Sequence, residues 1–306
     1  MEIYLPIAEI SVNWIMIVGM GAAVGFLSGV FGVGGGFLLT PLLVFYGIPP
    51  GVAVATQACH ITASSVSGAL THWRRNGIDF VMGGVLAVGG LVGSILGVQL
   101  FRILQQTGQV EFTVTAGYVL LLSSIGGLML NESVRAIRAR RRGDPPQLTR
   151  HVQHSWILRL PLKMRFRHSK LYISVIPPLA LGTLVGILTA ILGVGGGFVL
   201  VPAMIYILRM PTGAVVGTSQ FQILFVTAVT TILHAITNHT VDLVLAWLLV
   251  MGAAFGVQFG VRVGSKLRGE ELRALLGILV VAVALRLLFG LVATPDDIYS
   301  VVVGVP

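Results

Sequence analysis

The sequence predicts an all-α fold: a polytopic membrane helix bundle of two inverted repeats, with short or broken helices at two glycine motifs. Composition, long apolar runs and an internal repeat predict it. Of the 306 residues, 55% are hydrophobic and only 10% are charged, and the mean hydropathy is +0.93. A soluble domain carries about 25% charged residues, so we expect this chain to face lipid.

The apolar runs and the charges exclude several classes of protein. Residues 79–104 and 241–261 both exceed the ~18 apolar residues that mark a candidate membrane span. The net charge of +9 lies mainly in one linker and at predicted helix ends, which fits membrane orientation rather than nucleic-acid binding. The single Cys59 excludes an internal disulfide and a multi-cysteine metal site. We find no catalytic, metal-ligand or Walker motif, so we expect neither an enzyme nor a cofactor.

The internal repeat is read directly from the sequence. Residues 29–43 are GVFGVGGGFLLTPLL, and residues 190–204 are AILGVGGGFVLVPAM, at an offset of 161. Further pairs follow at offsets that grow to 162 and 163: Thr56 with Thr218, His72 with His234, Asp79 with Asp242, Gly93 with Gly256, and Gly97 with Gly260. A register that drifts by one at connecting loops indicates a duplicated structure.

Each copy contains five apolar segments. They are predicted at 12–31, 36–48, 51–71, 79–103 and 111–130, and again at 173–193, 197–209, 212–236, 241–263 and 272–293. The second segment of each copy would reach only ~20 Å as a helix, less than the ~30 Å hydrocarbon core, and suits a half-helix. We therefore predict a first repeat at 12–130, a linker at 131–172 and a second repeat at 173–293.

The linker carries eleven of the twenty Lys and Arg residues. It starts with a helix-prone basic run that Gly143 and the Pro145–Pro146 pair should end. Residues 156–170 mix Trp156 and Phe166 with basic groups, which suits either a membrane-surface segment or a solvated linker.

The charge distribution predicts an orientation. With the linker in the cytoplasm, both termini lie outside, and eighteen of the twenty basic residues fall inside. Arg102 falls outside, and Arg286 lies within a span. Since each copy has an odd number of segments, the second copy enters the membrane from the opposite side. Inverted repeats with interrupted helices are typical of secondary transporters, an inference that rests on analogy.

The glycine breaks are the first candidate site. Consecutive glycines disfavour a helix, and uncovered amides in hydrocarbon need partners. The amides of Gly34, Gly35 and Gly36, and those of Gly195, Gly196 and Gly197, each precede a short segment and could form an anion-binding nest. The alternative is a tight turn that lets helices approach closely.

The third segment of each copy is unusually polar. One helical face of the first carries Gln57, His60, Ser64, Ser67 and Thr71. Such a stripe should face other helices or a water-filled path, so its residues either bind an oxyanion or join helices. The candidate binding residues lie at the two segment starts: Thr56, Gln57 and His60, then Thr218, Ser219, Gln220 and Gln222. His60 is the titratable member, as a proton relay, an anion partner or a plain hydrogen-bonding group.

Two further features concern packing and charge. Arg286 lies centrally in the last segment, where a charge needs a partner or a ligand, and is a secondary candidate for substrate binding. The G-x-x-x-G pairs Gly93/Gly97 and Gly256/Gly260 are expected to let helices pack closely.

The doubled G-V-G-G-G-F-x-x-x-P motif at 32–41 and 193–202, the polar third segments and the basic linker resemble the TauE/SafE family, the sulfite exporter or DUF81-like group. The resemblance covers about residues 15–290. It implies a multi-pass bacterial inner-membrane carrier for a small organosulfur or inorganic sulfur anion, such as sulfite or sulfoacetate, bound near the glycine breaks. The alternatives are an anion channel and a membrane assembly or sensing subunit that transports nothing. The oligomeric state is not determined by the sequence.

Overall fold

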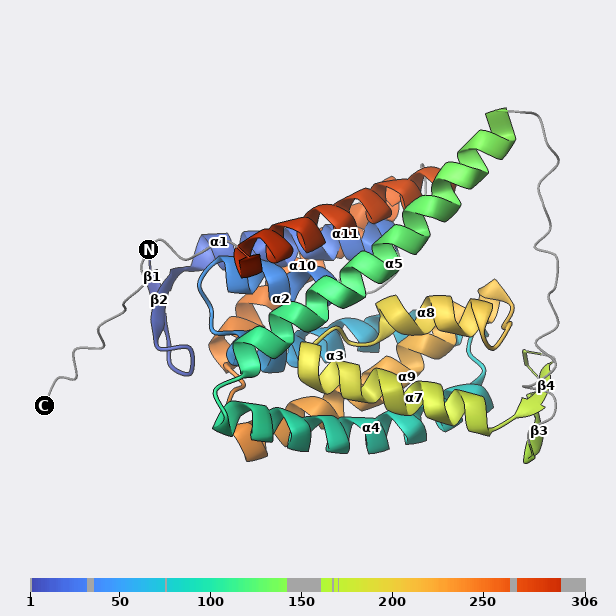
Figure 1. Ribbon diagram of the computed structural model, residues 1–306, viewed down its shortest axis with the longest axis horizontal. Coiled ribbons are helices and arrows are strands. Elements are labelled where there is room, and N and C mark those ends of the chain that lie inside the picture. Colours follow the sequence, from blue (N-terminus) through green and yellow to red (C-terminus); the bar gives the residue numbers. More distant parts are fainter. Residues whose placement is uncertain are drawn as a thin grey trace, which may run out of the picture.

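In the computed structural model of the protein, the chain forms a bundle of helices with a small hairpin at each end of its long axis (Figure 1). The structure describes residues 2–31, 36–74, 76–141, 161–166, 168–169, 171–264 and 269–292. The helices are α1 (Trp14–Phe31), α2 (Gly36–Phe45), α3 (Pro50–Arg74), α4 (Phe80–Gln106), α5 (Val110–Arg141), α7 (Ile176–Leu192), α8 (Gly197–Tyr206), α9 (Thr212–Leu233), the π-helix η1 (His234–Asn238), α10 (Leu243–Gly264) and α11 (Gly269–Val292). The strands are β1 (Glu2–Leu5), β2 (Ile10–Asn13), β3 (Lys163–Phe166) and β4 (Leu171–Ser174).

The ten apolar segments each form an α-helix in the expected order, which confirms the predicted fold class. The second segment of each copy is short as predicted: α2 and α8 have 10 residues each. Helix α5 continues past the apolar segment to Arg141, so the basic run at the start of the linker is helical as expected. The domain boundaries themselves stay a prediction.

Five helical stretches are long and apolar enough to cross a membrane. They are Phe80–Gln106, Val110–Asn131, Gly213–Asn238, Leu243–Gly260 and Leu275–Val292. Four shorter apolar helices accompany them in the described residues, α2 and α8 among them. Helix α3 is apolar at lower density, because its polar stripe interrupts the hydrophobic run.

Equivalent helices of the two copies make equivalent contacts. Helix α1 packs on α10 and α7 packs on α4, while α3 pairs with α9 and α5 with α11. A methyl group on Gly93 would overlap the backbone of Thr183, and one on Gly256 would overlap the backbone of Ala22. The prediction that the G-x-x-x-G pairs serve close packing is confirmed, because these glycines bring two helix backbones into contact.

The two antiparallel hairpins were not predicted from the sequence. β1 pairs with β2 directly before α1, and β3 pairs with β4 directly before α7, so each copy begins with one. Phe166 at the end of β3 is fully buried in an apolar cluster, so this part of the linker packs against the bundle. Most of the other described residues of the segment 156–170 are exposed, so its place at a membrane surface or in solvent stays a prediction, and Trp156 lies outside the described residues.

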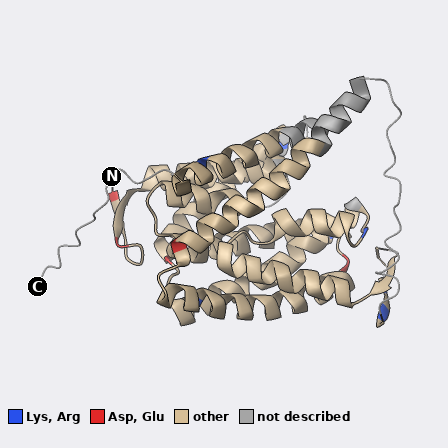
Figure 2. Ribbon diagram, viewed as in Figure 1, with Lys and Arg blue, Asp and Glu red and all other residues tan. Residues whose placement is uncertain are grey.

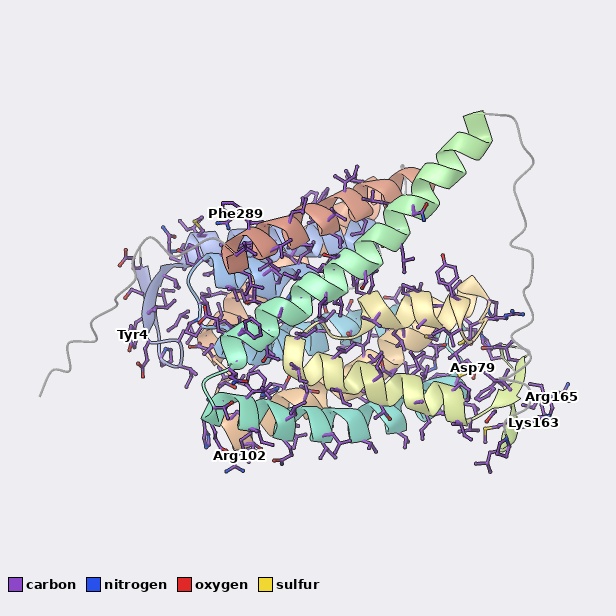
Figure 3. The ribbon with its side chains drawn as sticks, in the orientation of Figure 1. Tyr4, Asp79, Arg102, Lys163, Arg165 and Phe289 are labelled. Atoms are coloured by element: carbon purple, nitrogen blue, oxygen red, sulfur yellow. The ribbon has the colours of Figure 1, made fainter. Side chains whose placement is uncertain are left out.

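The hairpins and the charges distinguish the two ends of the bundle. Lys163 and Arg165 lie with Asp79 at one end, and Tyr4 and Arg102 lie at the other (Figure 3). Most of the bundle between these ends is free of charge (Figure 2). The linker hairpin and the N-terminal hairpin therefore lie at opposite ends of the bundle, while the inversion of the two repeats stays a prediction. Their placement relative to a bilayer stays a prediction.

Candidate functional site

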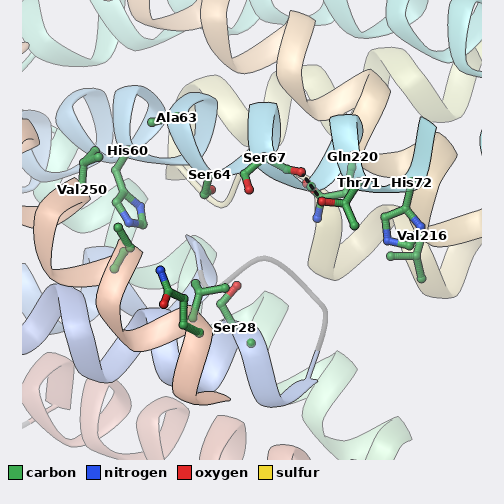
Figure 4. Close-up of a pocket in the computed structure, with 16 residues that line it drawn as sticks. Ser28, His60, Ala63, Ser64, Ser67, Thr71, His72, Val216, Gln220 and Val250 are labelled. Atoms are coloured by element: carbon green, nitrogen blue, oxygen red, sulfur yellow. Dashed lines mark hydrogen bonds between the residues drawn. The ribbon is translucent and has the colours of Figure 1, made fainter. Parts of the chain in front are cut away.

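A cavity of about 430 Å³ opens between helices α1, α3, α9 and α10 (Figure 4). We call it the His60 cavity. Its described lining residues are Ser28, Gly29, His60, Ala63, Ser64, Ser67, Gly68, Thr71, His72, Val216, Gln220, Val250, Ala253, Ala254, Val257 and Gln258. None of these described residues is acidic, and the polar ones are hydroxyls, imidazoles and amides. Such groups can donate hydrogen bonds to a negatively charged ligand.

One wall of the His60 cavity is the polar stripe of α3. His60, Ser64, Ser67 and Thr71 follow one another at spacings of four, three and four residues and point toward the cavity (Figure 4). The facing wall comes from α10 and is mostly apolar, with Val250, Ala253, Ala254 and Val257. The cavity therefore has a polar side and an apolar side.

In this wall, His60 is a buried side chain whose hydrogen-bonding atoms lack partners in the described structure. Its side chain is 4% exposed, and neither ring nitrogen has a hydrogen-bond partner in the described part of the chain. By contrast, Ser64 Oγ donates to Ile61 O at 2.9 Å, and Thr71 Oγ1 donates to Ser67 O at 2.8 Å. Because an unpaired buried polar group costs about 1–3 kcal/mol, an imidazole beside a cavity is a strong candidate for ligand binding.

Gly36, the last residue of the first glycine motif, lies against the second glycine break. A methyl group on Gly36 would come within 2.8 Å of Val194 O in the second break. Directly after the breaks, the rings of Phe37 and Phe198 stack with centroids 4.3 Å apart. Gly193, Gly195 and Gly196 have φ values of +70°, +70° and +76°, which side chains other than glycine rarely adopt. Gly34 and Gly35 lie outside the described residues.

Gln57 connects the second glycine break to α3. Its Nε2 donates to Gly193 O at 2.8 Å, and its Oε1 accepts a hydrogen bond from Thr40 Oγ1. Gly195, Gly196 and Gly197 are buried against neighbouring side chains and are not among the residues that line the His60 cavity. Of the residues predicted at the two segment starts, the cavity brings together His60 and Gln220.

Thr56 and Thr218 join the two copies. Thr56 Oγ1 accepts from the backbone N–H of Asp242, and Thr218 Oγ1 accepts from that of Asp79, both at 3.0 Å. Ser219 Oγ donates to Val216 O at 2.9 Å, one helical turn back. These hydroxyls therefore already take part in internal hydrogen bonds.

Asp79 and Asp242, which the sequence identifies only as a repeat pair, each join a helix start to a hairpin. Asp242 is buried and caps α10: its Oδ1 accepts from Val244 N and Leu245 N, and its Oδ2 accepts from Ile7 N of the first hairpin. Asp79 caps α4 through Met82 N, and its Oδ2 accepts from Ser169 N and Oγ in the second hairpin. An aspartate directly before an apolar helix is the sequence signal for such a cap.

Arg286 and Gln222 lie outside the His60 cavity. Arg286 is exposed on α11, with its guanidinium carbon 5.3 Å from the ring centroid of Phe45, so an aromatic face is its partner. Gln222 is fully buried on α9, and neither its Nε2 nor its Oε1 has a hydrogen-bond partner in the described structure.

An apolar bundle with several candidate spans indicates a multi-pass membrane protein. The sequence model described as "Sulfite exporter TauE/SafE" matches residues 17–287. The chain belongs to the sulfite exporter TauE/SafE family.

Curated relatives agree with this membership. The chain is 28% identical over 277 residues to "Probable membrane transporter protein YjnA" of Bacillus subtilis, covering 90% of this chain and 99% of the relative. It is 28% identical over 287 residues to a "Probable membrane transporter protein" of Xylella fastidiosa, covering 90% and 95%. It is 32% identical over 111 residues to "Sulfite exporter TauE/SafE family protein 5" of Arabidopsis thaliana, covering 35% and 24%. No solved structure matches the chain.

Proposed function

We propose that this protein is a secondary transporter that exports a small sulfur-containing anion across the bacterial inner membrane by alternating access. The observation that carries the proposal is His60, a buried imidazole in the wall of an open cavity whose two nitrogens have no partner among the described residues. Family membership supports the transporter class, and the family's description as sulfite exporters supports a sulfur anion.

The chemistry of the cavity favours an anion over a cation. Its described lining offers N–H and O–H donors from His60, Gln220, Ser67 and Gln258 and no carboxylate. Neutral donors can replace part of the hydration shell of an oxyanion without holding it too tightly for release, which a carrier requires. We propose that His60 and Gln220 contact the anion directly. The Gln57–Gly193 hydrogen bond and the Thr56 and Thr218 bonds then hold the surrounding helices in position.

The polar wall on α3 and the apolar wall on α10 also affect which sulfur anion the cavity can bind. A sulfonate group can meet the donors of α3 while a short carbon chain contacts Ala253 and Val257 on α10. The lining accommodates an organosulfonate as well as inorganic sulfite. In sulfoacetate the single methylene can contact the apolar wall, while the carboxylate requires a second donor such as Gln258.

The test is ligand-induced stabilisation of the purified protein in detergent with sulfite, sulfoacetate, taurine, sulfate and thiosulfate. A ligand at 100 times its Kd adds about 2.7 kcal/mol to the free energy of unfolding. We expect stabilisation by sulfoacetate and its loss in His60→Ala. The matched control is His168→Ala, an exposed histidine in the turn between β3 and β4. A flat response of the unmodified protein to every anion would contradict the proposed function.

A further inference from the structure

The two copies of the repeat differ at the His60 cavity. Gln222 on α9 is equivalent in sequence to His60 on α3, and Val226 is equivalent to Ser64. On the facing helices, Gly90 of α4 is equivalent to Ala253 of α10. His60, Ser64 and Ala253 border the open cavity between α3 and α10. The contact between α9 and α4 shows the equivalent arrangement when it is closed.

The closed contact is tight. A methyl group built on Gly90 would lie 2.7 Å from Gln222 Nε2 and would overlap Val226. Helix α9 also packs more extensively on α4 than α3 packs on α10. The pair α9–α4 is therefore packed more closely than the equivalent pair α3–α10, between which the cavity lies.

A second pair of equivalent positions also differs between the α3–α10 and α9–α4 contacts. His72 and Gly29 line the open cavity. Their counterparts His234 and Ala190 are joined, with His234 Nε2 3.0 Å from Ala190 O. The ring of Phe101 packs edge-on against His234, with centroids 4.9 Å apart. The imidazole of His234 and the ring of Phe101 therefore fill the position that is equivalent to the cavity lining at His72.

Gln222 is the residue that this closed arrangement leaves unexplained. Its amide is completely buried, and its donor and its acceptor both lack partners among the described residues. Burial of an unpaired amide is unfavourable, and a leucine of similar size would fill the same space without that cost. A conformation that separates α9 from α4 would let a ligand pair with these bonding groups.

We propose that Gln222 is a second anion contact, closed in this conformation, that opens when α9 separates from α4 while α3 closes on α10. The ligand is the same small oxyanion, and the Gln222 amide N–H donates to one of its oxygens. The proposal rests on the proposed transport function and assigns the opposite-facing state to a particular pair of helices. That state opens past His234 and Phe101, toward the end of the bundle that carries the β1–β2 hairpin (Figure 1).

The first test is Gln222→Leu, compared with Gln105→Leu at the exposed end of α4. We expect Gln222→Leu to be at least as thermostable as the unmodified protein and to keep anion binding at the His60 cavity. We also expect its transport rate in proteoliposomes to fall about tenfold or more, the loss typical of one hydrogen bond to a charged group. Transport at the rate of the unmodified protein, with binding intact, would overturn the inference and leave the proposed function standing. Absence of anion binding by the unmodified protein would instead contradict the proposed function.

A second measurement does not depend on the leucine variant folding. With Cys59 replaced by Ser, a single Gln222→Cys should resist a membrane-impermeant thiol reagent when no anion is present. It should react from the side of the β1–β2 hairpin once the transported anion is added to both sides. Equal resistance with and without the anion would show that α9 does not open there.

Discussion

At the scale of single residues, buried polar groups fall into two classes in this protein. Asp79 and Asp242 have their carboxylate oxygens occupied by backbone or hydroxyl donors, so they stabilise helix starts and hairpins. His60 and Gln222 are also buried, and none of their side-chain polar atoms has a partner in the described structure, where Thr240 Oγ1 and Asn238 Oδ1 are unpaired as well. Asp79 and Asp242 therefore stabilise the fold, whereas His60 and Gln222 are the side chains proposed to bind the ligand. A buried polar group without a hydrogen-bond partner lowers the stability of the protein, and a bound ligand can supply the missing partner.

The Asp242 cap gives a prediction at this scale. Asp242→Ala removes the acceptor for Val244 N, Leu245 N and Ile7 N, whereas Asp242→Asn keeps one acceptor oxygen. Loss of an N-cap costs about 1–2 kcal/mol, so we expect a clear drop in the melting temperature for the alanine variant. The asparagine variant should fall by less. Thermal unfolding in detergent measures both, and identical melting temperatures for the two variants would argue against the cap.

At the scale of helices, the small residues of α4 and α10 decide how closely each pair approaches. Gly93 on α4 faces the backbone of Thr183 on α7, and Gly256 on α10 faces the backbone of Ala22 on α1. These two helix pairs are built alike in both copies, in contrast to the contacts of α3 and α9. The pairs α1–α10 and α4–α7 are therefore closely packed in the same way. The contact of α3 with α10, by contrast, is looser than the equivalent contact of α9 with α4.

A pair of glycine variants on one helix tests this packing. Gly93→Ala should destabilise the protein by about 1–3 kcal/mol, because the added methyl group forces two backbones apart. Gly84→Ala on the same helix has no atom within 4 Å of the new methyl group, and should be neutral or stabilising by up to about 1 kcal/mol. Melting temperatures of opposite sign relative to the unmodified protein are the expected result. Equal effects would mean that α4 and α7 do not pack as described.

At the scale of the whole molecule, the two hairpins at opposite ends of the bundle predict opposite sides of the membrane. In a Cys59→Ser background, Tyr4→Cys should react with an impermeant thiol reagent added outside intact cells. Lys163→Cys should react only after the membrane is opened, since the basic linker is expected in the cytoplasm. Both positions are exposed, so access alone does not distinguish them. Labelling of both from outside would refute the proposed orientation.

Most of the fold follows from the sequence, because apolar length and the repeat are local properties. The segments 79–103 and 241–263 became α4 and α10 with boundaries shifted by one to three residues. The short segments became α2 and α8, each of which starts at the last glycine of its motif and continues past an internal proline. The hairpins were not predicted, because four-residue strands carry no clear periodic signal. Each hairpin also forms hydrogen bonds to a carboxylate that is far away in the sequence.

The sequence by itself determined that the chain is a duplicated apolar bundle with a polar stripe on α3, since hydropathy, repeat offset and helical spacing are written along the chain. Only the tertiary structure decided which polar residues have partners. Gln57 and Thr56 are bonded across the two copies, whereas His60 borders a cavity and Gln222 is closed against Gly90. The physical reason is that a hydrogen bond between residues more than a hundred positions apart depends on how helices pack, and packing differs between two copies whose sequences look equivalent.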